Sequence, residues 1–337
     1  MDARITKKRL NLLLSYDWLK MIALIVAAIV LWSLIFTTAA TRITPAQQFT
    51  IFNYSGTHVT TLFDDLDGAL KKKNVFSYDI LNITPMDATA GQEQAETLIQ
   101  TRLMTNEGDA LFVSGDERNK NSSVSYTDEQ GNTFSPTYLQ QFLTMYTPYA
   151  KPIYGEDGYI AEMEAFLGEY YGDFRAENAS INKEKVEEVF RARIKKQKDK
   201  RFKKEKKIKA GIQSEIERIE KYRDSLLKFE SYVAANYVSV VETTVYSSDY
   251  DGNVTSKTAS YSINLCPNQY MENLKELVYY TVSEKDAEGV THDNVYTAQN
   301  IHLVLLDTAK SNYAYSLYES LSLVNYLVER YCSALNS

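Results

Sequence analysis

The sequence predicts an α/β protein tethered by one N-terminal transmembrane helix. Three observations support this prediction. Residues 21–40 form an uncharged apolar run. From residue 47 onward, strand-like and helix-like segments alternate, which is typical of a mainly parallel sheet with crossover helices. Residues 183–235 have the pattern of one long helix or a helical pair, and a β-hairpin and further helices follow.

The apolar run is long enough to cross a bilayer. Its 20 residues span about 30 Å as a helix, the thickness of the hydrocarbon core. Residues 1–20 carry five Lys or Arg against two Asp, and Trp18 lies where an indole favours the interface. The positive-inside rule therefore predicts a cytoplasmic segment at 1–20, a single-pass cell-membrane anchor at 21–40 and an extracytoplasmic bulk. A signal peptide cleaved after Ala40 is the alternative, because small residues precede that bond.

Residues 46–150 are predicted to form the first part of an α/β lobe. Strands are expected at 48–54, 76–83 and 109–114, and helices at 60–73 and 91–106. In the first of these helices Leu62, Leu66 and Leu70 recur every four residues, which places them on one face. This β-α-β-α-β order predicts parallel strands with right-handed crossovers.

Residues 151–237 are predicted to be a helical insertion. Between residues 212 and 233, apolar side chains recur every three or four positions, which predicts a packed helix face or a short coiled coil. Gly211 is the expected kink.

Residues 238–337 are expected to complete the lobe. We predict a hairpin that turns at Asp251-Gly252, a helix at 268–282, a buried strand at 300–306 and a helix near 317–335. Cys266 and Cys332 are expected either as two free thiols or as one disulfide.

The composition limits the chemistry that the chain can support. Two cysteines exclude a disulfide scaffold and a four-cysteine zinc module, and three histidines leave little material for a histidine-rich metal site. The sequence contains no Gly-x-Ser-x-Gly elbow, P-loop, His-Glu-x-x-His or Cys-x-x-Cys motif. It therefore predicts a non-catalytic protein with no metal and no cofactor.

The most strongly charged segment is 191–209, which holds 12 Lys or Arg and two acidic residues. We expect its lysines to bind an anionic surface, such as phospholipid head groups or a wall polyanion. A solvated helix, neutralised by the acidic remainder of the chain, is the alternative. The extracytoplasmic topology argues against nucleic acid as a partner. The lysines chosen for this role are Lys203, Lys204, Lys206 and Lys207.

The order of elements in residues 47–116 resembles the first lobe of the extracellular solute-binding proteins of ABC importers, a type II periplasmic-binding fold. The strand at 49–54, the helix at 60–73, the strand at 76–83 and the segment 101–113 carry the resemblance. It implies a membrane-tethered module that binds a small solute. The chain departs from the family pattern in having Gly108-Asp109 where Pro-Asp is usual, no lipidated cysteine and no full second α/β lobe.

The candidate site follows from the position of the expected strands. Ligands of open parallel sheets bind beyond the carboxyl ends of the strands. Those ends hold Tyr54, Ser55, Ser114 and Asp116. We expect Tyr54 to stack on a ligand, and Ser55 and Asp116 to hydrogen-bond it. Ordinary strand-end loops are the competing interpretation.

A second function is kept open. In this alternative the protein is a cell-envelope structural or assembly protein without a ligand. Its helical arm would then contact a protein partner or an anionic surface.

Overall fold

The computed structural model describes residues 7–8, 11, 18–39, 43, 45–89, 95–248, 253–285, 290–308 and 316–336. The chain divides into two compact units, Met1–Thr44 and Pro45–Ser337. Each unit is described by itself below.

The N-terminal unit contains helix α2 (Trp18–Ala39). Its residues 18–36 have a mean hydropathy of 2.6, and none of this stretch is buried. The expected apolar helix is therefore confirmed, and its length and composition suit a membrane span. A signal sequence has the same length, composition and N-terminal position. The alternative cleavage point after Ala40 lies outside the described residues.

The second unit is built on a six-stranded sheet in the order β3-β1-β4-β11-β8-β7. β1 pairs in parallel with β3 and β4, whereas β11 pairs antiparallel with β4 and β8, and β8 pairs antiparallel with β7. The α/β class is confirmed, but the sheet is mixed rather than mainly parallel. The strands are β1 (Gln48–Asn53), β3 (Asn82–Asp87), β4 (Ala110–Ser114), β7 (Ser239–Ser248), β8 (Val254–Asn264) and β11 (Ile301–Leu305).

Both faces of the central strands β1, β4 and β11 are buried. In β4, Phe112 belongs to one apolar cluster and Leu111 and Val113 to the other, because successive side chains of a strand point to opposite faces. Helices α4 (Leu66–Lys72), α7 (Tyr159–Tyr171), α9 (Glu205–Ala234) and α10 (Ser316–Tyr331) contribute to the first cluster. Helices α5 (Ala95–Met104) and α6 (Tyr138–Tyr146) contribute to the second. Burial on both faces explains the uninterrupted apolar runs of β4 and β11.

The strand expected at 76–83 begins only at Asn82, so its first half was predicted wrongly. The backbone N–H of Ser77 donates to Glu319 at 3.0 Å, and the Asp79 carboxylate binds Arg201 and Arg218. These side-chain partners hold residues 77–80 as a loop. The expected helix at 60–73 is divided at Asp65 into α3 (Thr61–Asp64) and α4.

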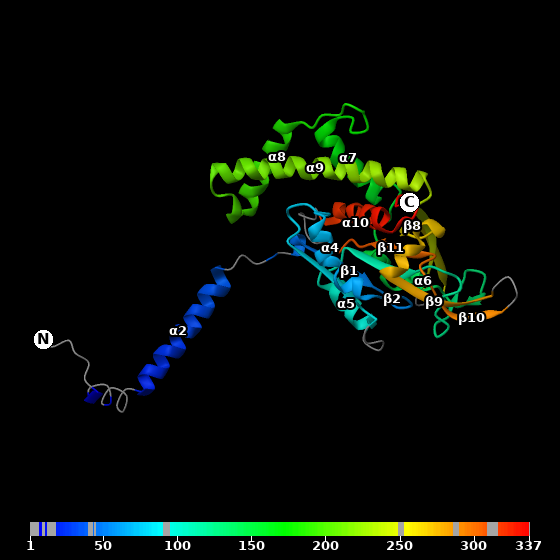
Figure 1. Cartoon of the computed structure of the whole chain (residues 1–337), viewed down its shortest axis with the longest axis horizontal. Helices are drawn as coiled ribbons and strands as arrows, with labels where there is room; N and C mark the ends of the chain where they lie inside the picture. Colours follow the sequence, from blue (N-terminus) through cyan, green and yellow to red (C-terminus); the bar gives the residue numbers. More distant parts are fainter. Residues whose placement is uncertain are drawn as a thin grey trace. The chain divides into compact units, whose positions relative to one another are not determined.

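The helical arm consists of α8 (Lys183–Gln197), η3 (Lys200–Phe202) and α9 (Figure 1). The chain breaks at Lys198, which has a left-handed φ of 52°, so the kink expected at Gly211 is wrong. Gly211 lies inside α9 for a different reason. A Cβ at this position would come within 2.5 Å of the Phe190 and Phe202 rings, so glycine allows α8 and η3 to pack against α9.

The apolar face predicted between residues 212 and 233 is a packed face. Ile219, Tyr222, Leu226 and Phe229 of α9 are fully buried in the first cluster, together with side chains of α10. The Asn325 side-chain amide of α10 donates to the Ser225 carbonyl of α9 at 2.8 Å. The predicted insertion therefore shares one core with the lobe.

The helix expected at 268–282 is wrong. Residues there form the 3₁₀ helix η4 (Gln269–Glu276) and then strand β9 (Val278–Lys285). Val278, Tyr280 and Val282 are buried at every second position, which is the strand period. β9 pairs with β2 (His58–Val59) and β10 (Thr291–Thr297) in a three-stranded sheet.

The hairpin of β7 and β8 and the C-terminal strand and helix are confirmed as β7, β8, β11 and α10. The expected turn at Asp251-Gly252 lies outside the described residues. The remaining elements are η1 (Pro45–Gln47), β5 (Tyr126–Thr127), β6 (Thr133–Phe134) and η2 (Thr147–Tyr149).

Candidate functional site

Tyr54, at the carboxyl end of β1, points into the core. Its side chain is fully buried, its hydroxyl donates to Glu96 Oε1 at 2.6 Å, and its ring meets Phe142 edge-on at 5.1 Å. Burial and the neighbouring Glu96 carboxylate raise the pKa of the Tyr54 hydroxyl well above its usual range. The structure therefore places Tyr54 where it supports α5 and α6, and the expectation that it stacks on a ligand is wrong. Ser55 lies in the turn that follows, partly exposed.

Asp116 follows β4 and is held by a dense set of hydrogen bonds. It accepts from the Arg118 backbone N–H at 2.8 Å, from Arg118 Nε at 2.9 Å and from Asn300 Nδ2 at 3.0 Å. Burial opposes ionisation of Asp116, but these hydrogen bonds outweigh burial and hold its pKa well below the usual range. Ser114 is buried, and its hydroxyl accepts from the Asp116 backbone N–H at 3.3 Å.

A cavity of about 740 Å³ opens beside Asp116, and we call it the strand-end cavity. It lies among the end of β4, the start of α6 and strands β7, β8 and β11. Of the four predicted ligand-binding residues, only Asp116 lines it. Other lining residues that the sequence did not single out are Gln140, Glu242, Tyr246, Asn300 and His302.

His302 is the most unusual of these residues. It lies in β11, almost fully buried, with Nδ1 at 2.9 Å from the Ser262 hydroxyl. Burial lowers its pKa to about 4, although the nearby Asp116 carboxylate acts in the opposite direction. The imidazole is therefore neutral at neutral pH. A Cβ at Gly115 would come within 2.6 Å of His302 Nε2. The backbone at residue 115 can therefore approach the His302 ring this closely only because the residue is glycine.

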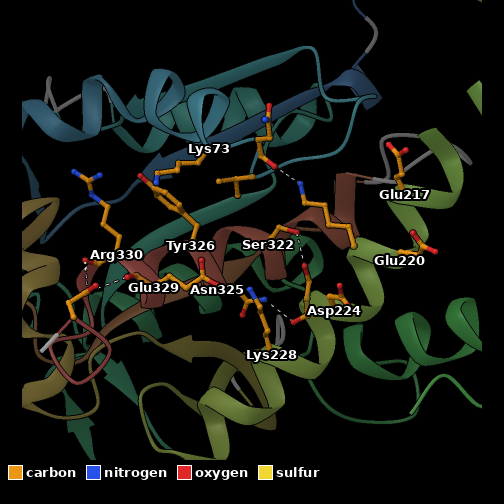
Figure 2. A pocket seen from close by; sticks show the side chains of 15 residues that line it. Lys73, Glu217, Glu220, Asp224, Lys228, Ser322, Asn325, Tyr326, Glu329 and Arg330 are labelled. Atoms are coloured by element: carbon orange, nitrogen blue, oxygen red, sulfur yellow. Dashed lines mark hydrogen bonds and ion pairs between the residues drawn. The ribbon is translucent and has the colours of Figure 1, made fainter. Parts of the chain in front are cut away.

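A second cavity of about 740 Å³ lies between the end of α4, α9 and α10 (Figure 2). Its charged side chains balance, four cationic and four acidic: Lys73, Lys221, Lys228, Arg330, Glu217, Glu220, Asp224 and Glu329. Lys228 pairs with Glu329 at 2.7 Å, and Lys221 Nζ donates to the Asn74 and Phe76 carbonyls. These contacts join α9 to α10 and to the α4–β3 loop. We interpret this cavity as a structural groove.

The arm is fixed to the body by a buried ion cluster, formed by Asp79, Asp199, Glu215, Arg193, Arg201 and Arg218. Arg218 has no exposed side-chain area and contacts both Asp79 and Glu215. Arg193 pairs with Glu215 at 3.0 Å, and Arg201 pairs with Asp79 at 3.1 Å. Three positive and three negative charges cancel in this cluster. Arg193 and Arg201 of the basic segment are therefore structural.

The lysines of the basic segment behave differently. Lys203, Lys204, Lys206 and Lys207 are all exposed, and none has an ion pair with any residue that the structure describes. They lie between η3 and the first turn of α9, where the arm reverses direction. The structure thus brings together a compact basic surface, but it does not bring that surface to the strand-end cavity.

The two cysteines and the acidic residues give no metal centre in the described part of the chain. Within that part, no group of three or more His, Cys, Asp or Glu side chains is placed to hold a metal ion. Cys266 and Cys332 are both buried free thiols. Burial, and then the neighbouring Glu272, raise the pKa of the Cys266 thiol well above its usual range.

Comparisons with known proteins do not assign the chain to a family. No protein-family model, curated protein or solved structure matches it. The resemblance to solute-binding proteins rests on the order of elements alone, so the function has to be inferred from the geometry of the chain's own residues.

Proposed function

We propose that the protein is a membrane-tethered, extracytoplasmic and non-catalytic module that binds a small hydrophilic solute in the strand-end cavity. The observation that supports this most is the position of the cavity. It lies beyond the carboxyl end of β4, where the sheet changes from parallel to antiparallel pairing. Ligands of open α/β sheets bind in crevices beyond the carboxyl ends of the strands. The volume of about 740 Å³ is in the usual range for a small-molecule site.

The lining favours an uncharged, hydroxyl-rich solute. Arg118, which lines the cavity, already pairs with Asp116 and Glu284. The exposed Glu242 and the amide of Gln140 offer an acceptor and a donor for hydroxyl groups. Tyr246 supplies a partly exposed ring that already meets Phe134 edge-on at 5.5 Å and can pack against a sugar-like ring.

Binding is tested on the full chain in detergent. The melting temperature is recorded against a panel of sugars, polyols, amino acids and short peptides, and any stabilising compound is then titrated calorimetrically. We expect Glu242→Gln and Tyr246→Ala each to weaken binding by about tenfold, as loss of one hydrogen bond or stacking contact does. Glu129→Gln and Tyr154→Ala, at exposed positions outside the cavity, are the matched controls. Absence of any stabilising compound, or equal affinity in all four variants, would contradict the proposal.

The alternative of an envelope assembly protein is favoured by one observation, the unpaired lysines at the reversal of the arm. A deletion of the arm is not a usable test, because residues 183–235 supply fully buried core side chains such as Ile219 and Phe229. Crosslinking in cells should instead compare the native chain with one carrying Gln at the four exposed lysines. A specific protein partner that is lost in this variant would support assembly.

A further inference from the structure

The reversal of the arm concentrates uncompensated positive charge. Residues 195–209, which we call the basic elbow, hold exposed lysines without an ion pair among the described residues. Its acidic residues are already engaged, Asp199 with Arg201 at 2.8 Å and Glu205 with Arg191 at 2.5 Å. The lysines therefore face solvent without an ion pair in the described part of the chain. They are Lys195, Lys196, Lys198, Lys200, Lys203, Lys204, Lys206, Lys207 and Lys209.

The basic elbow lies next to the point where the chain enters the folded unit. Arg201 of the elbow donates to Asp79 at 3.1 Å. Two residues further on, the backbone N–H of Leu81 donates to the Gln47 carbonyl at 2.8 Å. Gln47 ends η1, the first element of this unit. A short path of hydrogen bonds thus connects the elbow to the start of the folded unit.

The covalent chain limits how far that start can be from α2. Only residues 40–44 separate Ala39 from Pro45. A chain covers at most about 3.5 Å per residue, so Pro45 lies within about 20 Å of the end of α2. If α2 spans a bilayer, the elbow is held at a high effective concentration near its surface, and weak attraction per lysine is then sufficient for docking.

We infer that the basic elbow docks the folded unit on the anionic phospholipid head groups of the bilayer that α2 spans. This inference rests on the membrane tether of the proposed function and does not depend on the strand-end cavity. Lysine ammonium groups near an anionic leaflet each favour the docked state by about fivefold, and the attraction falls off within a Debye length. The arginines of the buried ion cluster hold the elbow to the body, so docking orients the whole unit.

The test uses the full chain reconstituted in nanodiscs of phosphatidylcholine alone or mixed with phosphatidylglycerol. A water-soluble amine-acylating reagent modifies the exposed lysines, and mass spectrometry gives the rate at each one. We expect the elbow lysines to react about tenfold more slowly in the anionic nanodiscs, and molar salt to abolish this protection. Exposed lysines elsewhere, such as Lys257 and Lys275, should react equally in both lipids.

Two variants with the same change in net charge separate docking from a general charge effect. One carries Gln at Lys203, Lys204, Lys206 and Lys207. It should lose the protection of Lys195 and Lys196, because about fivefold per lysine multiplies to several hundredfold over four positions. The control carries Gln at Lys72, Lys183, Lys257 and Lys275, which are also exposed, and should keep the protection.

The outcomes test the docking of the basic elbow separately from the membrane tether through α2. A chain that fails to stay with the nanodisc in molar salt overturns the membrane tether itself. A chain that stays in the nanodisc, with equal acylation rates in both lipids, overturns only the docking of the elbow. Protection by added soluble wall polyanion, but not by anionic nanodiscs, would also overturn it and would assign the elbow to the cell wall.

Discussion

Arg218 Nη1 lies 3.2 Å from Asp79 Oδ2, and the Arg218 side chain has no solvent-exposed area. The two residues are 139 positions apart, one in α9 and the other in the loop before β3. This pair, with Glu215, joins the helical arm to the body through charge in a place that solvent does not reach.

We expect Arg218→Met to lower the free energy of unfolding by about 3 kcal/mol, because removing one member of a buried ion pair leaves the other desolvated. Breaking a buried ion pair costs about 3–5 kcal/mol. We expect the lower value because Asp79 still pairs with Arg201 and Glu215 still pairs with Arg193. Urea unfolding monitored by circular dichroism measures the change. Lys207→Met, at an exposed position, should change stability by less than about 0.5 kcal/mol. Equal effects of the two substitutions would contradict a buried ion cluster.

Two glycines inside helices should respond to alanine in opposite directions. Gly68 of α4 has open space at its Cβ position, so Gly68→Ala should stabilise the protein by about 1 kcal/mol through helix propensity. Gly211→Ala should destabilise it by about 1–3 kcal/mol, because the new methyl group must displace the Phe190 and Phe202 rings. Paired thermal denaturation curves compare them. If Gly211→Ala were also stabilising, the close packing of η3 on α9 would be wrong.

His302 should make stability depend on pH. Burial lowers its pKa from an ordinary 6.5 to about 4 in the folded state, so the unfolded chain binds a proton first as the pH falls. The contribution is therefore complete above about pH 6.5 and is lost between that value and about pH 4, by up to about 3 kcal/mol. His302→Gln should flatten the pH dependence of the unfolding free energy in this window. An unchanged slope in the His302→Gln variant would contradict a buried, neutral imidazole.

Both cysteines should be inert in the native protein. Cys266 and Cys332 are buried thiols, and the raised pKa of Cys266 further lowers its thiolate fraction. We expect a chromogenic disulfide reagent to titrate no thiol at pH 8 in the folded protein and two thiols in denaturant. A single rapidly reacting thiol before unfolding would show that one of them is accessible, and none after unfolding would indicate a disulfide.

The predicted topology can be tested on intact cells. If α2 anchors the chain with its N-terminus in the cytoplasm, external protease should remove the folded unit from spheroplasts, and a tag before residue 18 should be protected. Before protease is added, recovery of the tag and the folded unit on one membrane-bound chain distinguishes an anchor from a cleaved signal sequence. Full protection of the chain until lysis would refute the orientation.

Local patterns in the sequence predicted much of the secondary structure. The runs that became β1, β4 and β11 are buried on both faces, and the recurrence of apolar residues in α9 and α10 matches the helical period. Prediction failed where a distant partner decides the backbone. Asp79 and Ser77 bind side chains more than 100 positions away, and η4 and β9 divide a segment whose apolar residues suit either a helix or a strand.

The candidate site was predicted only in part. The rule about strand ends found Asp116, but it could not determine that Tyr54 points into the core, since that depends on α5 and α6 packing beneath β1. His302 was visible as the one histidine inside an apolar run, and a neutral polar ring in a buried strand is a signal that could have been used. Glu242 and Tyr246 reach the cavity only because β7 pairs with β8, a pairing that brings the far end of the sheet to the site.

The place of β11 in the sheet has a consequence for how the protein is made. β11 comes from residues 301–305, yet it lies between β4 and β8 and joins the two halves of the sheet. If the part of the chain after α2 is translocated in the order of synthesis, this strand arrives almost last, so the edges of β4 and β8 stay open during translocation. Unpaired edges favour intermolecular pairing, and late non-local closure slows folding. Secretion of this protein should therefore be sensitive to chaperones that shield strand edges until residue 305 has emerged.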